Sequence, residues 1–386
     1  MKINCLTYIF LGIIISCFYG CSRDSENIRE NIRETIHETK LLYFTEQYVT
    51  AERKECEAIR ADAKDPDDKI GNKKLTVLKN GNTFKIPYYA NVASIDDENP
   101  MITRAVVALH GQDRNADTYY KRMLAAAQME SSQLDTLLII SPQFLAESDI
   151  NLHALDSEHL YWSSGGWKIG FLSKDEEQNP RSDRISSFSI MDSLIVKLKH
   201  NYPNLRNIIL SGHSAGGQFL NRYAAATPIY QSLNDERINV RFIVNNPSSY
   251  VYLNKKRKVD GSPSYKVPTI TCSAYNDYKY GLDDLPNYLS AIGANKIKEQ
   301  FYKRKVVYLL GAQDNNTSSS SLDTSCGALL QGNHRLERGM IYYDYLKDFY
   351  GDSIENTQTM KIVPGAGHNS REMFQSELGR FYAFRK

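Results

Sequence analysis

Short, uninterrupted apolar runs recur along the chain and constrain its fold more than any other feature. They are separated by segments long enough for a helical crossover, and they span residues 105–109, 137–140, 208–210, 242–244, 306–310 and 360–363. A strand that is apolar on both faces belongs in a parallel sheet that helices cover on both sides. Intervening stretches such as 185–200 and 218–226 have the pattern of those helices. The sequence therefore predicts an α/β fold with a mostly parallel central sheet and helices on both faces.

An antiparallel hairpin is expected to open this sheet. Residues 75–78 and 84–89 have the composition of strands, and Asn80-Gly81-Asn82 between them is a turn signal. Two later stretches, 143–182 and 247–300, exceed the length of ordinary loops, and such excursions in a compact domain are usually lids or binding loops. We therefore expect one large domain over residues 73–386 with long, lid-like insertions.

The first 20 residues have the layout of a secretory signal. Lys2 precedes an uncharged apolar run from Ile3 to Tyr19, which is marginal for a spanning helix because that needs about 20 apolar residues. A small residue precedes both Cys17 and Cys21, so each resembles the cysteine of a bacterial lipobox, which is lipidated and becomes the mature N-terminus. The sequence does not choose between them, and an uncleaved signal anchor stays an alternative. We expect an exported protein, either lipid-anchored in the bacterial cell envelope or secreted.

Residues 21–72 are dense in charge and form the second predicted segment. Ile28, Ile32 and Ile36 recur at four-residue spacing, which favours a solvated helix. The stretch has too few heptads for a partner-binding coiled coil, so we interpret it as a tether. In an oxidising compartment, Cys272 and Cys326 farther along the chain are candidates for a disulfide.

Composition excludes several classes of protein. Lys and Arg number 47 against 45 Asp and Glu, a formal net charge of +2, which argues against nucleic acid as a partner. Apolar residues make up 41% and charged residues 24%, values that exclude a wholly disordered chain and a polytopic membrane protein. The sequence contains no C-x-x-C or H-x-x-x-H pair, so it predicts no structural zinc site.

A G-x-S-x-G motif lies at Gly212-His213-Ser214-Ala215-Gly216, directly after an apolar strand and before a helix that starts with small residues. Such a serine sits on a strained strand-to-helix turn, which forms only where the flanking positions lack bulk. The motif alone is weak, since about one chain in ten of this length would contain it by chance. Ser214 is therefore a candidate nucleophile, and an ordinary helix N-cap is the alternative.

Three other strand ends carry residues that suit the same chemistry. Asp314 follows the run 306–310, and the glycine-bracketed His368 follows the run 360–363. The order Ser, Asp, His matches one known order of a catalytic triad, with Asp323 as the alternative carboxylate. Gln112 follows the run 105–109, where a loop donates one backbone N–H of an oxyanion hole, and Ala215 would supply the other.

In these motifs the chain resembles the α/β-hydrolase superfamily, and within it the serine esterases and polyester depolymerases, over about residues 73–386. The resemblance implies an α/β-hydrolase fold and cleavage of carboxylic esters, small or polymeric, through a Ser-His-Asp triad and an acyl-enzyme. It implies neither a metal nor an organic cofactor. A serine peptidase or amidase on the same fold stays an alternative, as does a non-catalytic surface-binding protein.

Candidate substrate-binding residues fall in and beside the long excursions. Trp162 and Trp167, the two tryptophans of the chain, lie in a glycine-rich stretch that suits a substrate wall or, equally, a satellite core. Tyr250 lies just after the run 242–244, at the sheet edge where open α/β sheets bind ligands. His110 is a further candidate, although a histidine at this place more often organises the turn.

Overall fold

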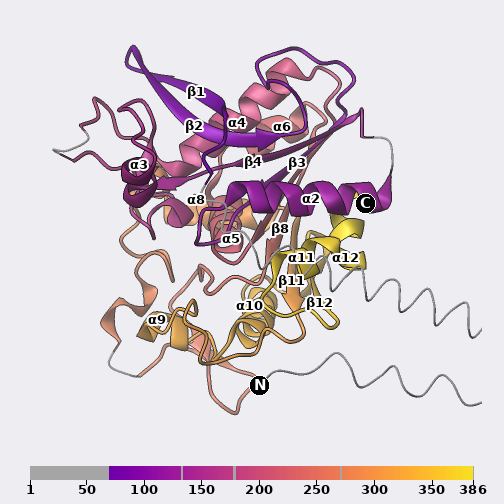
Figure 1. The fold of residues 1–386 in the computed structure, drawn as a ribbon. Helices are drawn as coiled ribbons and strands as arrows, with labels where there is room; N and C mark the ends of the chain where they lie inside the picture. Colours follow the sequence, from indigo (N-terminus) through magenta and orange to yellow (C-terminus); the bar gives the residue numbers. More distant parts are fainter. Residues whose placement is uncertain (1–68, 132–133, 177–179, 270–271, 386) are drawn as a thin grey trace, which may run out of the picture. The chain divides into compact units, whose positions relative to one another are not determined.

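The computed structural model describes residues 69–131, 134–176, 180–269 and 272–385. Eight strands form one sheet in the order β1-β2-β4-β3-β7-β8-β11-β12 (Figure 1). Their bounds are β1 Lys73–Lys79, β2 Asn82–Ala90, β3 Arg104–Leu109, β4 Leu137–Pro142, β7 Asn207–His213, β8 Asn239–Asn245, β11 Val306–Gly311 and β12 Gln358–Val363. Every pair from β4 to β12 is parallel, so the predicted α/β fold class is confirmed.

The sheet opens with the expected antiparallel hairpin. β1 pairs with β2 from Lys73 opposite Tyr88 to Lys79 opposite Asn82, and β2 then pairs antiparallel with β4. The turn consists of Asn80 and Gly81, with φ of 50° and 83°. Two successive positive φ angles define the type I′ turn that a two-residue hairpin prefers, and Asn-Gly is the pair that adopts it most readily.

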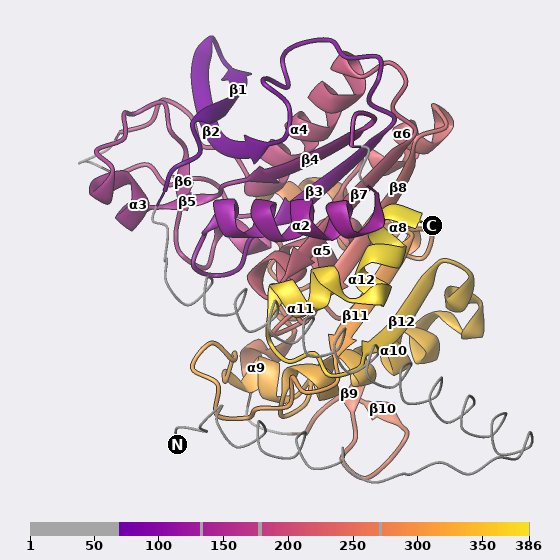
Figure 2. The same cartoon turned by 45° about the vertical axis from the view of Figure 1, so that its right-hand side comes forward.

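Helices cover both faces of the sheet (Figures 1 and 2). One face carries α2 (Ala116–Glu130), α11 (Ser370–Gln375) and α12 (Glu377–Arg380). The other carries α4 (Ser187–Asn201), α5 (Ala215–Ala226), α8 (Ala294–Phe301) and α10 (Arg335–Tyr350). The remaining elements are β5 Leu145–Ala146, α3 Glu147–Leu152, β6 Tyr161–Trp162, η1 Trp167–Ile169, α6 Tyr230–Asp235, β9 Arg257–Lys258, β10 Tyr265–Lys266, η2 Ser273–Asn276, α7 Asn287–Ile292, α9 Cys326–Leu329, η3 Asp352–Asn356 and η4 Phe381–Arg385.

Burial on both faces explains the uninterrupted apolar runs. In β3, Ala105 and Val107 belong to the core cluster under α4 and α5, while Val106 and Ala108 belong to the cluster under α2. All four side chains are fully buried. Because successive side chains of a strand point to opposite faces, a strand that is covered on both sides has no position left for a polar residue.

The excursions predicted as insertions contain structure of their own. Residues 143–182 contribute β5, α3, β6 and η1, and their Trp162 and Trp167 join the main core cluster. Residues 247–300 contribute β9, β10, η2 and α7, and most of α8. Cys272, in this second excursion, forms a disulfide with Cys326, so the predicted pairing is confirmed.

The N-terminal predictions fall on residues that the structure does not describe. The expected signal at 1–20, with Cys17 and Cys21, lies outside the described residues, as does nearly all of the expected tether at 21–72. Within the described ranges, no helix combines the length and apolar character that crossing a membrane requires.

Candidate active site

Ser214 occupies the turn between β7 and α5. Its backbone has φ 58° and ψ −114°, a conformation that L-residues rarely adopt. The Ser214 N–H donates to the carbonyl of Asn245 in the adjacent strand β8, which fixes the turn to the sheet. Strain of this kind persists only when the surroundings determine it, and it presents the serine hydroxyl at the carboxyl end of β7.

Glycines make this turn possible, and two of them show the reason plainly. A Cβ on Gly212 would lie 2.4 Å from the carbonyl oxygen of Gly216. A Cβ on Gly216 would lie 2.6 Å from the carbonyl oxygen of Leu109 and 2.7 Å from that of His110. Both contacts are with backbone atoms, so any side chain at these positions would displace the chain. The first turn of α5 therefore packs directly on the loop that follows β3.

His368 and Asp314 meet Ser214 at this edge of the sheet. The Nε2 atom of His368 lies 3.0 Å from the Ser214 hydroxyl oxygen, and its Nδ1 lies 2.7 Å from Oδ2 of Asp314. Asp314 follows β11 and His368 follows β12, the last two strands of the sheet. Residues 154 positions apart are thus joined in one line of hydrogen bonds.

The direction of these bonds follows from their chemistry. An ionised carboxylate only accepts hydrogen bonds, so Nδ1 of His368 carries the proton and Nε2 is free to accept from the Ser214 hydroxyl. The Asp314 side chain is 2% exposed and that of His368 24% exposed. A shielded carboxylate thus holds an imidazole that solvent and ligands can still reach.

Two residues that hold this line were not identified from the sequence. Arg335, at the first position of α10, forms a buried ion pair with the carboxylate of Asp314 at 3.6 Å. The Asn246 side chain donates to the carbonyl of Gly367 and accepts from the N–H of Gly311. Asn246 therefore ties the loop that carries His368 to the strand that precedes Asp314.

His213, the neighbour of Ser214, packs against the ring of His368. Its ring centroid lies 4.6 Å from that of His368, and its Nδ1 lies 3.3 Å from the Tyr119 hydroxyl. Burial, and then the nearby positive charges, hold the pKa of His213 well below its usual range. His213 is therefore a neutral packing partner of His368.

The loop after β3 brings Gln112 to the same place. Its side chain is held at both ends, because Nε2 donates to the Ser164 carbonyl and Oε1 accepts from Lys168. Within the described residues its backbone N–H donates no hydrogen bond. Ala215 is the first residue of α5, where N–H groups have no partner inside the helix. The N–H of Gln112 belongs to the loop after β3 and that of Ala215 to the start of α5, and these two segments pack together at Gly216.

Two solved structures of similar fold align over most of the chain. Poly(aspartic acid) hydrolase-1 from Sphingomonas sp. KT-1 aligns with a TM-score of 0.51 and 21% identity, covering 82% of this chain and 100% of that one. LpqC, a poly(3-hydroxybutyrate) depolymerase from Bordetella parapertussis, aligns with a TM-score of 0.52 and 20% identity, covering 81% and 90%. No family model and no curated protein sequence matches the chain.

The chain has the α/β-hydrolase fold. Its mostly parallel sheet with an opening antiparallel hairpin is what the resemblance led us to expect, and the match extends across the domain. In this fold, the loops at the carboxyl edge of the sheet surround the serine and determine what can reach it.

Four residues predicted to line a substrate site are instead buried in the α/β-hydrolase core. His110, Trp162, Trp167 and Tyr250 are each fully shielded from solvent. The His110 ring contacts the Gly111 carbonyl and accepts from the Phe144 N–H, and burial lowers its pKa to about 4. The structure thus places the two tryptophans in the core and not in a substrate wall, and they belong to the main core cluster and not to a satellite one.

Asp323, the alternative carboxylate, lies in a different cluster. Its Oδ2 accepts from Lys279 Nζ at 2.6 Å and from the Tyr280 hydroxyl at 2.8 Å. Burial alone would raise the pKa of Asp323, but the hydrogen bonds from Lys279, Ser325 and Tyr280, with the charge of Lys279, lower it strongly. The structure brings Asp314, and not Asp323, to His368.

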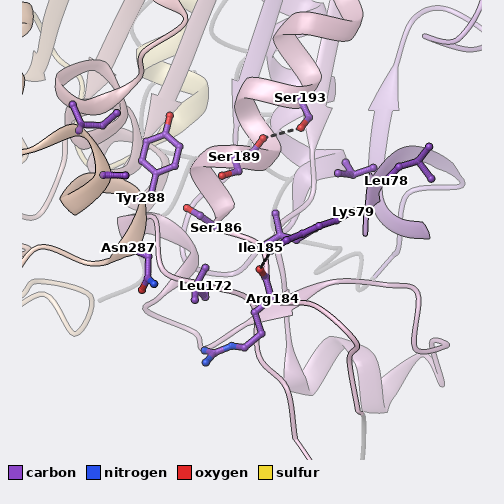
Figure 3. Close-up of a pocket in the computed structure, with 13 residues that line it drawn as sticks. Leu78, Lys79, Leu172, Arg184, Ile185, Ser186, Ser189, Ser193, Asn287 and Tyr288 are labelled. Atoms are coloured by element: carbon purple, nitrogen blue, oxygen red, sulfur yellow. Dashed lines mark hydrogen bonds between the residues drawn. The ribbon is translucent and has the colours of Figure 1, made fainter. Parts of the chain in front are cut away.

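A separate pocket lies elsewhere in the α/β-hydrolase domain (Figure 3). It has a volume of about 490 Å³ and is lined by residues of β1, α4 and α7, among them Leu78, Ser189 and Tyr288. None of the residues around Ser214 contributes to it. Among the described residues, no group of three or more His, Cys, Asp or Glu side chains is arranged to hold a metal ion.

Proposed function

We propose that this protein is a serine hydrolase that cleaves carboxylic esters, with Ser214 as nucleophile, His368 as general base and Asp314 as the triad acid. The observation that carries the proposal is the unbroken line from Asp314 through His368 to the Ser214 hydroxyl, with distances of 2.7 and 3.0 Å. A serine on a strained turn, an imidazole within its reach and a carboxylate behind the imidazole are the parts that acyl transfer needs.

The reaction proceeds in two steps. His368 takes the proton of the Ser214 hydroxyl as the oxygen attacks the acyl carbonyl, and then gives that proton to the departing alcohol. A water molecule next attacks the acyl-enzyme, with His368 again as the base. Asp314 keeps the proton on Nδ1 of His368 and stabilises the imidazolium, and the buried Arg335 forms an ion pair with the Asp314 carboxylate at 3.6 Å.

Negative charge that forms on the carbonyl oxygen needs donors that are in place beforehand. The N–H groups of Gln112 and Ala215 are the donors we assign. A single donor of this kind contributes about 3 kcal/mol to stabilising the transition state in other enzymes. The side-chain bonds of Gln112 to Ser164 and Lys168 support this role, because they limit the movement of its backbone.

Ester specificity is tested with two classes of substrate. We expect the full-length protein to turn over 4-nitrophenyl acetate and not peptidyl 4-nitroanilides, and we expect Ser214→Ala to abolish the turnover above the uncatalysed rate. Turnover of the anilides would favour the amidase alternative. Unchanged ester turnover in Ser214→Ala would refute the assignment of the nucleophile.

We also propose that the protein is exported and lipid-anchored through Cys17 or Cys21. The disulfide between Cys272 and Cys326 supports export, because such bonds persist mainly in oxidising compartments. Mass spectrometry of the mature N-terminus tests the anchor. A diacylated cysteine at either position is expected, and an unmodified chain that still begins at Met1 would contradict it.

A further inference from the structure

Positive charge gathers around Asp323, at the side of the site where Gln112 lies. Lys279 forms an ion pair with Asp323, and the two side chains are 25% and 15% exposed. Three further cations act electrostatically on the same carboxylate, and they are Lys168, Arg222 and Arg338. A single carboxylate therefore lies among four basic side chains.

Two of these cations are buried without a carboxylate of their own. Arg222 is fully buried, and its guanidinium donates to the carbonyls of Gln218, Ser249 and Lys279. Arg338 is also fully buried and donates to the carbonyls of Ser248 and Gly332. Within the described ranges neither forms an ion pair, and Nη2 of Arg338 has no hydrogen-bond partner. The hydrogen bonds of both guanidinium groups go to neutral acceptors, and Asp323 acts on their charges without a direct contact.

Lys168 is the cation that lies nearest to the proposed oxyanion donor. Its ammonium group donates to Oε1 of Gln112 at 2.7 Å and forms no ion pair with the described carboxylates. The residue is partly exposed. Burial, and then repulsion from Lys279 and Arg222, lowers the pKa of Lys168 to about 8.

The charges of this group do not balance. Among the described residues, Asp323 and Glu337 are the two carboxylates found to act on these cations, and Glu337 acts on Arg338. Four cations against two carboxylates leave an excess of two positive charges. The ion pair of Arg335 with Asp314 adds none, because its charges cancel. An anion brought into a partly desolvated site of this kind is attracted more strongly than it would be in water.

Hydrogen bonds connect this excess to the start of α5, the helix that follows Ser214. Arg222 is eight residues after Ser214 on the same helix, and helical side chains point back toward the N-terminus. The Arg222 guanidinium indeed reaches back one turn to the Gln218 carbonyl, and the Gln218 N–H bonds the Ser214 carbonyl. η1, which carries Lys168, packs against this same helix.

We propose that Lys168 and Lys279 form a subsite for a carboxylate of the substrate, so that the preferred substrate is an ester whose acyl part carries a negative charge. The proposal rests on the serine-hydrolase function above. Lys168 holds Gln112, which would bind the scissile carbonyl, and that carbonyl belongs to the acyl part. The ammonium groups of Lys168 and Lys279 meet the carboxylate, while the buried Arg222 and Arg338 strengthen the field beneath them.

The test compares two esters of nearly the same size. The full-length protein is given 4-nitrophenyl hydrogen glutarate, which is anionic, and 4-nitrophenyl methyl glutarate, which is neutral, with the rate of Ser214→Ala subtracted as background. We expect kcat/KM to be about 10-fold higher for the anionic ester, the size of effect that one charged hydrogen bond gives. Lys168→Met should remove this preference, and Asp323→Asn, which deletes the competing carboxylate, should increase it.

The matched control is Lys296→Met, which deletes an exposed lysine of α8 and should leave the ratio unchanged. Equal rates for the two esters in the wild-type protein would overturn the subsite and leave the hydrolase proposal standing. An equal fall for both esters in Lys168→Met would also overturn it, since Lys168 would then only position Gln112. Failure to hydrolyse either ester would instead refute the proposed function itself.

Discussion

The two acidic residues that the sequence offered for one role lie in two differently built regions. Asp314 belongs to the triad floor, which we define as Ser214, Asp314 and His368, and each of these follows a strand of the sheet. Asp323 belongs to the charged rim, which we define as residues 272–281 and 322–326. A disulfide and an ion pair join the two segments of this rim.

The difference concerns what holds each region in place. Backbone contacts fix the floor to the sheet, since Ser214 is bonded to β8 and the backbone of Gly311 packs against that of Gly367. The side chains of Arg335 and Asn246 add to these contacts. Covalent and ionic links between side chains fix the rim. Changes to the rim should therefore alter substrate preference, while changes to the floor should abolish the chemistry.

The largest expected difference between the two regions is in kcat, when each of the two carboxylates is replaced by its amide. Asp314→Asn should lower kcat for the neutral ester 4-nitrophenyl acetate about 10,000-fold, because an amide can favour the wrong tautomer of His368. Asp323→Asn should change the same kcat by less than about 10-fold, since its contacts are in the rim. Steady-state kinetics with 4-nitrophenyl acetate measures both, and comparable losses in the two variants would contradict the assignment of Asp314.

Removing the disulfide should loosen the rim and spare the floor. The double variant Cys272→Ser/Cys326→Ser opens a loop with a sequence separation of 54 residues, for which loop entropy gives a loss of about 4 kcal/mol in the free energy of unfolding. Thermal denaturation should show a lower Tm, and dithiothreitol should shift the wild-type protein in the same way. At 25 °C the folded variant should keep most of its kcat for the neutral ester, and loss of that activity would argue that the rim supports the floor.

The preference for an anionic ester should depend on pH through Lys168. Its pKa of about 8 means that the ammonium form is lost as the pH rises from 7 to 9. The ratio of kcat/KM for the anionic over the neutral ester should fall several-fold across this interval, because both esters share the pH dependence of the triad and only one needs the cation. Lys168→Arg, which stays charged, should show a flat ratio, and a flat ratio in the wild-type protein would contradict this role.

The sequence predicted the floor because its residues are marked by their neighbours. Each of Ser214, Asp314 and His368 follows an apolar strand, and parallel strands bring their carboxyl ends to one edge. Arg335 could not be found in this way, because it lies on a helix start with no local motif and its role exists only through a tertiary contact with Asp314.

The surroundings of the site were harder to predict than its floor. Trp162 and Trp167 have the composition of a substrate wall or of a small core, and only the path of the excursion decides between them. The same holds for Lys168, whose significance comes from the cations beside it and not from its place in the sequence. Local patterns therefore located the residues of the proposed triad, while the folding of long loops determined what surrounds them.

The most direct test of the account is covalent labelling of the full-length protein with a fluorophosphonate, followed by peptide mapping. We predict one adduct, on the peptide that contains Ser214, formed at least about 1,000-fold more slowly in His368→Ala because the base that activates the hydroxyl is gone. An adduct on another serine, or an unchanged labelling rate in His368→Ala, would contradict the claim that Ser214 is the nucleophile and His368 its base.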